Sequence, residues 1–341
     1  MSTKEKALLK PVFKPGKLGA PGANYTRTLV IARTKSENTD WIGQALPDLP
    51  TAIYVADDDQ SPLHPPVNKG HEAMVYLTYL IDNYDRLPDI SIFMHSHRYA
   101  WHNAELLNFD AVRLLQQLRD EKVIYDGYVN TRCVWAPGCP DWIKPRKTEP
   151  QIDRPEQAEI GKAWTQLFPF EPVPELLGQP CCSQFALSKD RIRSIPRERL
   201  MYVRDWLLKT ELHDEISGRV FEYMWQVLFT NDNMYCPLQH VCWCETYGLC
   251  FENAEHYAKV EALRMSMEAK RNELAAWRRK KVEFDEARSK GDTKALALLQ
   301  MPKENRDLEL LGELEAGSHK MKEEEILAIA RGKGYKYEPW K

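Results

Sequence analysis

Short β-branched runs alternate with segments of helical spacing, and this alternation limits what the chain can fold into. Four runs have the apolar character of buried strands: residues 27–33, 51–57, 90–95 and 183–188. Residues 68–87 and 111–123 have helical apolar spacing, with Asp110 as the N-cap of the second. The order predicts an α/β fold with a mostly parallel sheet flanked by helices.

Composition divides the 341 residues into three parts. Residues 1–24, rich in proline and glycine, predict an extended arm, and residues 25–252 predict the α/β catalytic domain. Inside that domain, residues 133–180 predict a long ordered loop, followed by helices at 196–209 and 215–229. Residues 253–341 predict a charged helical extension, weakly helical at its end. Its hydrophobic seam comprises Val260, Leu263, Met267, Leu274, Trp277 and Phe284.

Charge and hydropathy argue against a polycationic nucleic-acid binder and against a membrane-spanning or secreted protein. The formal net charge of −3 indicates no global polycation, so any nucleic-acid surface must be local. No stretch approaches about eighteen apolar residues, and the N-terminus has no apolar run of signal-peptide length. We therefore expect a cytoplasmic protein without a membrane anchor. Its eight cysteines are then expected to be reduced thiols rather than a disulfide framework.

Acidic and amide side chains follow the second predicted strand. Asp57, Asp58 and Asp59 come where ligand crevices form in open α/β sheets. They suit a divalent metal with a nucleotide diphosphate, or a cation such as a guanidinium, or they form a solvated acidic turn. Asn68 and Glu72 open the next predicted helix, where they either bind substrate or only cap the helix.

Three histidines lie near the end of the third predicted strand. His95 and His97 are two residues apart and are expected to point the same way, with His102 in the following loop. Imidazole groups that titrate near neutrality are the usual proton shuttles. A metal site is the weaker interpretation, because no third ligand is fixed, and a buried histidine satisfied by hydrogen bonds is the structural alternative.

Glu222 stands on an otherwise aromatic helical face that also carries Trp225, a candidate for substrate contact. An acid is costly to bury there unless it has a task or a partner, so Glu222 is the preferred catalytic carboxylate. A salt bridge, for example to Arg219, is the alternative. Cys181 and Cys182 are candidate nucleophiles if a base lies within reach, although adjacent cysteines are more often core residues.

Two further groups need an interpretation. The cysteines between Cys236 and Cys250 fit no standard zinc module, so packing or a local redox pair is expected. Cations recur along residues 264–281 with few opposing acids, which predicts a basic helical face able to meet RNA phosphates, or merely a solvated helix. These cations are Arg264, Lys270, Arg271, Arg278, Arg279, Lys280 and Lys281.

Phosphate-binding glycine motifs are absent. The chain has no Gly-x-x-x-x-Gly-Lys-Ser/Thr loop and no Gly-x-Gly-x-x-Gly turn, which argues against ATP-dependent activation and nicotinamide chemistry. We therefore expect no cofactor and no catalytic metal, and a substrate that arrives already activated.

Several longer segments resemble a fungal family labelled as a domain of unknown function, over roughly residues 24–252. They include NYTRTLVIARTKSENTDWI, NKGHEAMVYLTYLIDNYDRLPDISIFMHSHRYAWHN, CPDWI, QPCCSQFALSKDRIRSIP and DEISGRVFEYMWQVLF. Within that family the chain is similar to the cytosolic arginine-containing cyclodipeptide synthases. Other members look glycosyltransferase-like, so the resemblance implies a glycosyltransferase-A-like fold.

The resemblance implies a reaction and its partners. Arginyl-tRNA and a second aminoacyl-tRNA would be condensed into a cyclo-Arg-Xaa diketopiperazine in fungal secondary metabolism. We assign the residue roles from the chemistry of the side chains. Asp57, Asp58 or Glu72 would recognise the guanidinium. His95 and His97 would move protons, Glu222 would deprotonate or orient an amine, and the basic face would hold tRNA.

Three points stay open at the level of sequence. An acyl-enzyme would form on Cys181, Cys182, Ser96 or Ser183, or on none of them. A nucleotide-sugar glycosyltransferase using Asp57 to Asp59 with manganese is the alternative enzyme. A non-enzymatic RNA or protein adaptor built on the C-terminal helix is the third hypothesis.

Overall fold

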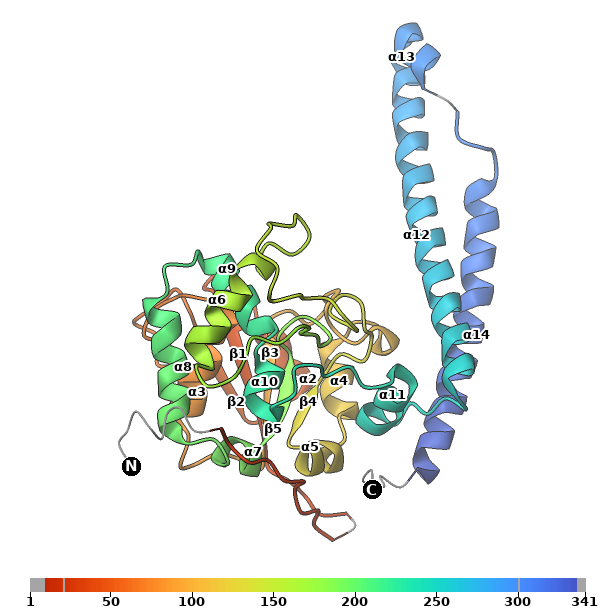
Figure 1. Cartoon of the computed structure of the whole chain (residues 1–341). Helices are drawn as coiled ribbons and strands as arrows, with labels where there is room; N and C mark the ends of the chain where they lie inside the picture. The colour runs from red at the N-terminus through yellow and green to blue at the C-terminus, as the bar shows by residue number, and fades with distance from the viewer. Residues whose placement is uncertain (1–9, 21, 300, 336–341) are drawn as a thin grey trace. The chain divides into compact units, whose positions relative to one another are not determined.

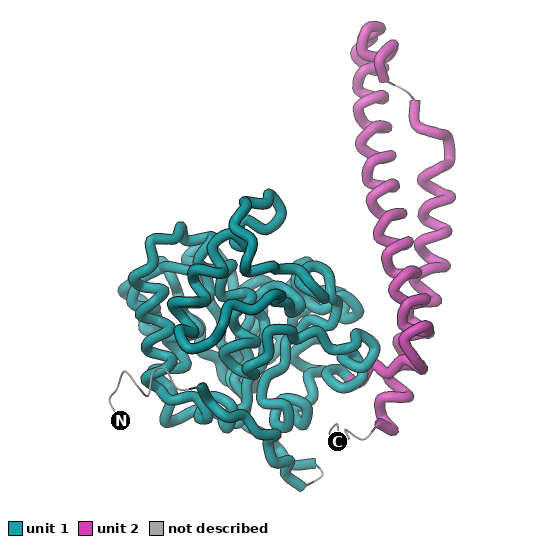
Figure 2. Tube along the Cα trace, in the orientation of Figure 1, with its two compact units in different colours: residues 1–247, 337–341 teal, residues 248–336 magenta. Residues whose placement is uncertain are grey.

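The computed structural model describes residues 10–20, 22–299 and 301–335. The predicted N-terminal arm falls partly outside these residues, and its described part contains no helix or strand. Figure 2 shows two compact units, one up to residue 247 and the other beginning at residue 248. Within the described residues, no helix is both long enough and apolar enough to cross a membrane.

A five-stranded sheet, in the order β2-β1-β3-β5-β4, forms the centre of the first unit. Its strands are β1 (Arg27–Arg33), β2 (Thr51–Val55), β3 (Ile90–His95), β4 (Tyr128–Asn130) and β5 (Phe185–Ser188). The parallel pairing of β2, β1 and β3 confirms the prediction for the centre of the sheet. The predicted strand at β5 is present but runs antiparallel to both β3 and β4, so the sheet is mixed rather than mostly parallel. Strand β4 is short and was missed.

Helices cover both faces of the sheet (Figure 1). One face packs Val30, Phe93 and Phe185 against α3, α6, α8, α9 and α10. On the other face, the Arg27 guanidinium donates to Asp120 and to the carbonyls of Leu115 and Leu118, which ties β1 to α4 and α5. The helix bounds are α2 (Asp40–Ala45), α3 (Glu72–Asp82), α4 (Ala111–Gln117), α5 (Asp120–Asp126), α6 (Gln157–Leu167), α7 (Lys189–Arg193), α8 (Arg197–Lys209), α9 (Asp214–Glu222), α10 (Trp225–Thr230) and α11 (Gln239–Tyr247), with the 3-10 helix η1 (Glu105–Leu107).

Helix boundaries differ from the predictions where the chain turns. Asp110 caps α4 as predicted, because its carboxylate accepts from the Val112 amide at 3.0 Å. The expected single helix over 111–123 is wrong, since Leu118 adopts an extended ψ and separates α4 from α5. Residues 215–229 likewise divide into α9 and α10. The loop assigned to 133–180 is wrong around α6, whose buried Ile160, Ala163, Trp164 and Leu167 have helical spacing.

Disulfide bonds correct the expectation of reduced thiols. Cys133 bonds to Cys242, Cys139 to Cys236, and Cys181 to Cys182, and no cysteine in the described residues is free. The expectation failed because it was drawn from an assumed compartment, whereas pairing depends on which segments the fold brings together. The two long-range bonds fasten the segment around residues 133–139 to the segment around 236–242.

The second unit is a pair of long helices. It contains α12 (Ala254–Ser289), α13 (Thr293–Leu298) and α14 (Arg306–Gly334), with α12 and α14 side by side (Figure 1). The predicted seam is confirmed at Val260, Met267 and Leu274, which are buried. Gly317 of α14 permits this packing, because a Cβ there would lie 2.9 Å from the Met267 side chain. The weakly helical end expected for the chain is wrong over α14, a helix of 29 residues.

Removing Cys133–Cys242 tests the role of the long-range bonds. We expect Cys133→Ser with Cys242→Ser to lower the free energy of unfolding by about 2–5 kcal/mol, because the lost bond spans a sequence separation of 109. Denaturant unfolding measures the change. In the control, Cys181→Ser with Cys182→Ser, the lost bond joins neighbours and we expect a much smaller change. Equal losses in the two variants would contradict the loop-closure account.

Candidate functional site

A pocket of about 660 Å³ in the first unit brings together side chains from distant segments. Seven candidate site residues from the sequence line it: Glu72, His95, His102, Cys181, Cys182, Ser183 and Glu222. They come from the start of α3, the end of β3, the loop after β3, the segment before β5, and the end of α9. The volume lies within the range of small-molecule sites, so this pocket is the candidate functional site.

Glycines allow α9 to approach α3 closely enough to form the pocket. A Cβ on Gly218 would lie 2.9 Å from the His71 ring and 3.2 Å from the Gly70 backbone. Gly70 itself has φ 69° and donates its amide to Asp214 at the start of α9. This contact places Glu72, in the first turn of α3, and Glu222, one turn after Gly218, in the same pocket wall.

The pKa of the Glu222 carboxyl group is raised toward neutral pH. Burial raises its pKa to about 7, and the nearby negative charges of Glu72 and Glu156 add to that rise. The Cys182 amide opposes it by donating to Glu222 Oε1 at 2.7 Å. A carboxyl with such a pKa exchanges protons readily at neutral pH, which is what a general acid or base requires.

Acidic groups dominate the pocket wall. Glu72, Asp153, Glu156 and Glu215 line it together with Glu222. Arg219 is the one lysine or arginine in that lining, and it pairs with Glu215 at 2.9 Å and with Glu156 at 3.5 Å. Burial also raises the pKa of Glu156. Such an excess of carboxylates favours a cationic ligand.

Two histidines stand on one side of the pocket. His95 Nε2 lies 2.9 Å from the Cys182 carbonyl oxygen, and its ring centroid is 4.5 Å from that of His102. Burial, with the positive charges of His95, His97 and Arg132, lowers the pKa of His102 to about 3. His102 is therefore neutral at physiological pH, and its buried Nε2 has no partner among the described residues.

His97 does not share this face, so the predicted pair is wrong. The strand ends at His95 and the chain bends at Ser96, which breaks the two-residue alternation on which the prediction depended. The exposed His97 ring instead lies 3.4 Å from Glu37, whose carboxylate also accepts from the Ser96 hydroxyl at 2.8 Å.

Four other predicted substrate-binding residues are absent from the pocket lining. Asp57 accepts from the Lys35 amide, and Asp58 pairs with the Lys35 ammonium at 3.2 Å, so these acids secure a turn. Asn68 is exposed and does not cap α3, which begins at Glu72. Trp225 is fully buried against Phe185 and Phe221 because its helical face belongs to the core.

The predicted cysteine chemistry is corrected by the bonds observed. Cys181 and Cys182 line the pocket, but their sulfurs are joined to each other, so neither offers a nucleophilic thiolate in this state. The local redox pair expected between residues 236 and 250 is wrong for Cys236 and Cys242. Each is bonded to a cysteine of the 133–139 segment.

The predicted basic face lies on α12, and part of it is neutralised. Arg264 pairs with Glu261 and Glu268, Lys270 pairs with Glu313 of α14, and Lys281 pairs with Asp285. The remaining four predicted cations are exposed and form no ion pair within the described residues. They are Arg271, Arg278, Arg279 and Lys280.

Some pocket residues were missed by the sequence analysis. Trp101 and Trp142 line the pocket, and each already has an arginine guanidinium near its ring, Arg132 at 5.4 Å and Arg154 at 4.9 Å from the ring centroids. Glu156 also went unnoticed. Its signal was available, since it immediately precedes the apolar spacing of α6, but the proline-rich surroundings indicated a loop.

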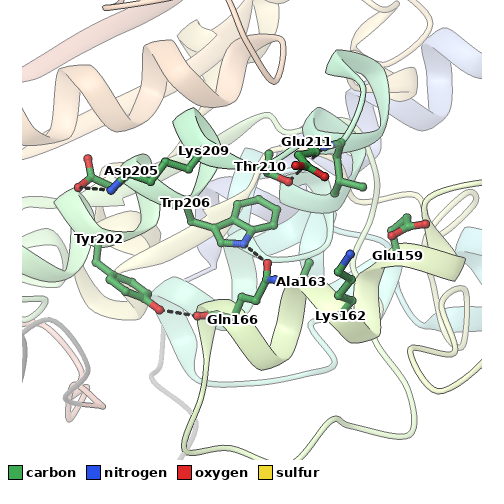
Figure 3. Close-up of a pocket in the computed structure, with 11 residues that line it drawn as sticks. Glu159, Lys162, Ala163, Gln166, Tyr202, Asp205, Trp206, Lys209, Thr210 and Glu211 are labelled. Carbon is green, nitrogen blue, oxygen red and sulfur yellow. Dashed lines mark hydrogen bonds and ion pairs between the residues drawn. The ribbon is translucent and has the colours of Figure 1, made fainter.

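A second hollow of about 680 Å³ lies between α6 and α8 (Figure 3). Two of its polar side chains already have partners, since Tyr202 donates to the backbone carbonyl of Gln166 and Trp206 donates to the Gln166 side chain, both at 2.6 Å. Asp205 and Lys209 form a weak pair at 3.9 Å. None of the predicted site residues lines it, so the acidic pocket remains the stronger candidate.

Comparison with known proteins fixes the family. A family of proteins of unknown function, DUF3431, matches residues 29–245, which include the sheet from Leu29 onward and every residue that lines the acidic pocket. The chain belongs to the DUF3431 family. No curated protein and no solved structure matches it. The DUF3431 match confirms the predicted relationship to a family of unknown function.

Glu222→Gln tests the buried carboxyl through the pH dependence of stability. The folded-state pKa of about 7 exceeds the ordinary glutamate pKa of 4.5, so the folded protein binds more protons and its stability falls as pH rises between these values. Relative to the wild type, the variant should gain about 3 kcal/mol in free energy of unfolding between about pH 4 and pH 8. Denaturant unfolding across this range measures the gain.

Asp89→Asn is the control of opposite sign. The Thr26 amide and Lys189 lower the pKa of Asp89 to about 2, so its stabilising contribution is complete above the ordinary aspartate pKa of 3.8. The control should therefore show a constant loss between about pH 5 and pH 8. A stability difference between Glu222→Gln and wild type that stays flat across the same range would refute the raised pKa.

Proposed function

We propose that this DUF3431 protein is an aminoacyltransferase. It joins arginine, delivered as arginyl-tRNA, to a second tRNA-borne amino acid and closes the product to cyclo-Arg-Xaa. The observation that supports the proposal is the acidic pocket around Glu222, whose pKa of about 7 suits proton transfer from an amine at neutral pH. The resemblance to arginine-containing cyclodipeptide synthases supplies the reaction class.

The pocket wall is suited to an arginyl side chain. A guanidinium presents a planar fork of donors that carboxylates bind in pairs, and Glu72, Asp153 and Glu156 provide carboxylates in one lining. The rings of Trp101 and Trp142 already have guanidinium groups near them, so the same rings offer stacking partners to the substrate. Guanidinium recognition is thus assigned to Glu72 and its neighbours, in place of Asp57 and Asp58.

The chemistry needs two additions of an α-amine to an activated ester. In each, a new amide C–N bond forms, the ester C–O bond breaks, and tRNA leaves through its ribose hydroxyl. Glu222 accepts the proton that the attacking amine loses, and the leaving oxygen takes up a proton. The ester supplies the driving force, so neither ATP nor a redox cofactor is required. His95, at the pocket wall, orients the reacting groups.

Transfer RNA would be held by the exposed cations of α12. Arg271 and Arg278 are exposed about two turns apart on the same side of that helix, and the exposed Arg279 and Lys280 follow Arg278 directly. Phosphate contacts by such side chains release counterions and produce salt-dependent binding without sequence preference. The proposal requires the cytoplasm, where charged tRNA is available.

A second candidate is favoured by the disulfides. Disulfides persist mainly in oxidising compartments, where charged tRNA is not supplied. A nucleotide-sugar-dependent glycosyltransferase suits such a compartment. It predicts manganese-dependent binding of a nucleoside diphosphate that Asp57→Asn weakens, and unchanged binding in that variant would remove this candidate.

Product formation tests the first candidate. Purified protein with arginyl-tRNA and a mixture of other charged tRNAs should give cyclo-Arg-Xaa by mass spectrometry, without ATP and only with intact RNA. Glu222→Gln should lower the rate by about 100-fold or more, because the proton acceptor is lost. The control, Glu211→Gln, changes a carboxylate of the second hollow and should keep the wild-type rate. Equal rates in the two variants would exclude Glu222 as the proton acceptor.

Charge removal on α12 tests the tRNA contact. Replacing Arg271, Arg278, Arg279 and Lys280 by alanine should weaken tRNA binding and flatten its dependence on salt, because four phosphate partners are lost. Lys259→Ala on the same helix removes an exposed cation that pairs with Glu255 and serves as the control. Filter binding at several salt concentrations measures both. An unchanged salt slope in the fourfold variant would place tRNA elsewhere.

A further inference from the structure

The disulfides Cys133–Cys242, Cys139–Cys236 and Cys181–Cys182 differ in which parts of the chain they connect. Cys133–Cys242 and Cys139–Cys236 span sequence separations of 109 and 97, so each is stabilised by folding of the chain that it encloses. Cys181–Cys182 joins neighbours and encloses no loop, and both its cysteines line the acidic pocket. Opening this bond therefore removes no long-range link from the fold.

The surroundings of the Cys181–Cys182 bond favour its opening to a thiolate. Cys181 is buried, whereas Cys182 is partly exposed, so an attacking thiolate reaches Cys182 first. The Arg132 guanidinium lies 3.4 Å from Cys181 Sγ and 3.8 Å from Cys182 Sγ. A fixed positive charge at this distance stabilises the thiolate that leaves. Arg132 is itself held in place by the buried carboxylate of Glu105.

The bond is also connected to the ionisable groups of the pocket. Both sulfurs and a Glu222 carboxylate oxygen lie within 4.8 Å of one another. The Cys182 amide donates to Glu222 at 2.7 Å, and the Cys182 carbonyl lies 2.9 Å from His95 Nε2. Cys182 and Ser183 have φ angles of 88° and 49°, in the left-handed region that side-chain-bearing residues adopt when their surroundings impose it.

We propose that Cys181–Cys182 is a reversible thiol switch that controls the arrangement of the acidic pocket. A thiolate of a dithiol reductant attacks Cys182 Sγ, which breaks the Cys181–Cys182 bond and releases the Cys181 thiolate beside Arg132. The second thiol of the reductant then displaces Cys182, which takes up a proton. The protein gains two thiols, and the reductant leaves as its own disulfide.

The switch acts on the pocket through the backbone. In the bonded state the ring formed by the two neighbours holds the left-handed turn, and the turn aims the Cys182 amide at Glu222. In the reduced state the turn relaxes, Glu222 loses that donor, and a thiolate stands in the pocket beside Arg132. This regulation does not depend on which reaction the pocket catalyses. An experiment that contradicts the proposed aminoacyl transfer therefore leaves the proposed switch untouched, and the reverse also holds.

Selective reduction is the first test. The full-length protein is equilibrated under native conditions with graded ratios of reduced and oxidised dithiothreitol, free thiols are trapped with N-ethylmaleimide, and peptides are mapped by mass spectrometry. We expect Cys181 and Cys182 to be labelled at ratios at which Cys133–Cys242 and Cys139–Cys236 stay bonded. Labelling of all these cysteines together, or resistance of Cys181–Cys182 until the protein unfolds, would overturn the proposal.

Amide hydrogen exchange is the second test, on the same protein before and after selective reduction. Exchange in residues 181–184 should become several-fold faster, while β1, which is remote in sequence from the bond, stays unchanged. Cys181→Ser with Cys182→Ser should show the fast exchange of the reduced protein and no response to dithiothreitol. Identical exchange of residues 181–184 in the oxidised and reduced wild type shows that the bond does not control the pocket, and overturns the proposal independently of any variant.

Discussion

The balance at Glu222 between burial and one backbone hydrogen bond is the interaction on which the account of the pocket depends. Burial disfavours the carboxylate, as do the charges of Glu72 and Glu156, whereas the Cys182 amide favours it. The resulting pKa of about 7 leaves both protonation states accessible at neutral pH. A fully solvated carboxyl would stay ionised, and one buried without the Cys182 donor would stay protonated more firmly.

The rest of the first unit can be understood as support for this balance. Gly218 and Gly70 let α9 and α3 approach, which brings two acids into one wall. The parallel strands end on the side where His95 faces the pocket, while the antiparallel β5 delivers Cys182 to Glu222. The long-range disulfides fasten the segment from residue 133 to residue 139, which lies in the connection between β4 and α6.

Sequence patterns predicted the parts of this structure that depend on local periodicity. The three parallel strands, the Asp110 cap and the buried seam of α12 follow from spacing that neighbouring residues determine. The antiparallel entry of β5 depends on tertiary packing and was not predicted. Helix α6 has local helical spacing, but its proline-rich surroundings indicated a loop, so it was missed. The prediction from strand alternation failed at His97, because the chain bends at Ser96 and the His97 ring lies beside Glu37.

In the candidate site, too, some residues could be predicted from local sequence patterns and others only from the folded chain. Glu222 was recognisable because an acid on an aromatic helical face conflicts with the rest of its face, and such local conflicts mark functional positions. Glu156, Trp101 and Trp142 carry no comparable conflict, and only the folded chain brings them to the pocket. Asp57 and Asp58 were attractive as an acidic triplet after a strand, yet Lys35 binds both through its amide and its ammonium.

Proton exchange on binding a guanidinium ligand is the most direct test of the central claim that Glu222 titrates near neutrality in a cation-binding pocket. Calorimetry of methylguanidine, which has no group that titrates near neutral pH, measures this proton exchange at about pH 7 in buffers of different ionisation enthalpy. A cation beside Glu222 lowers its pKa, so binding should release a fraction of a proton from the wild type and none from Glu222→Gln. Binding with no proton release from the wild type, or no binding at all, would contradict the account.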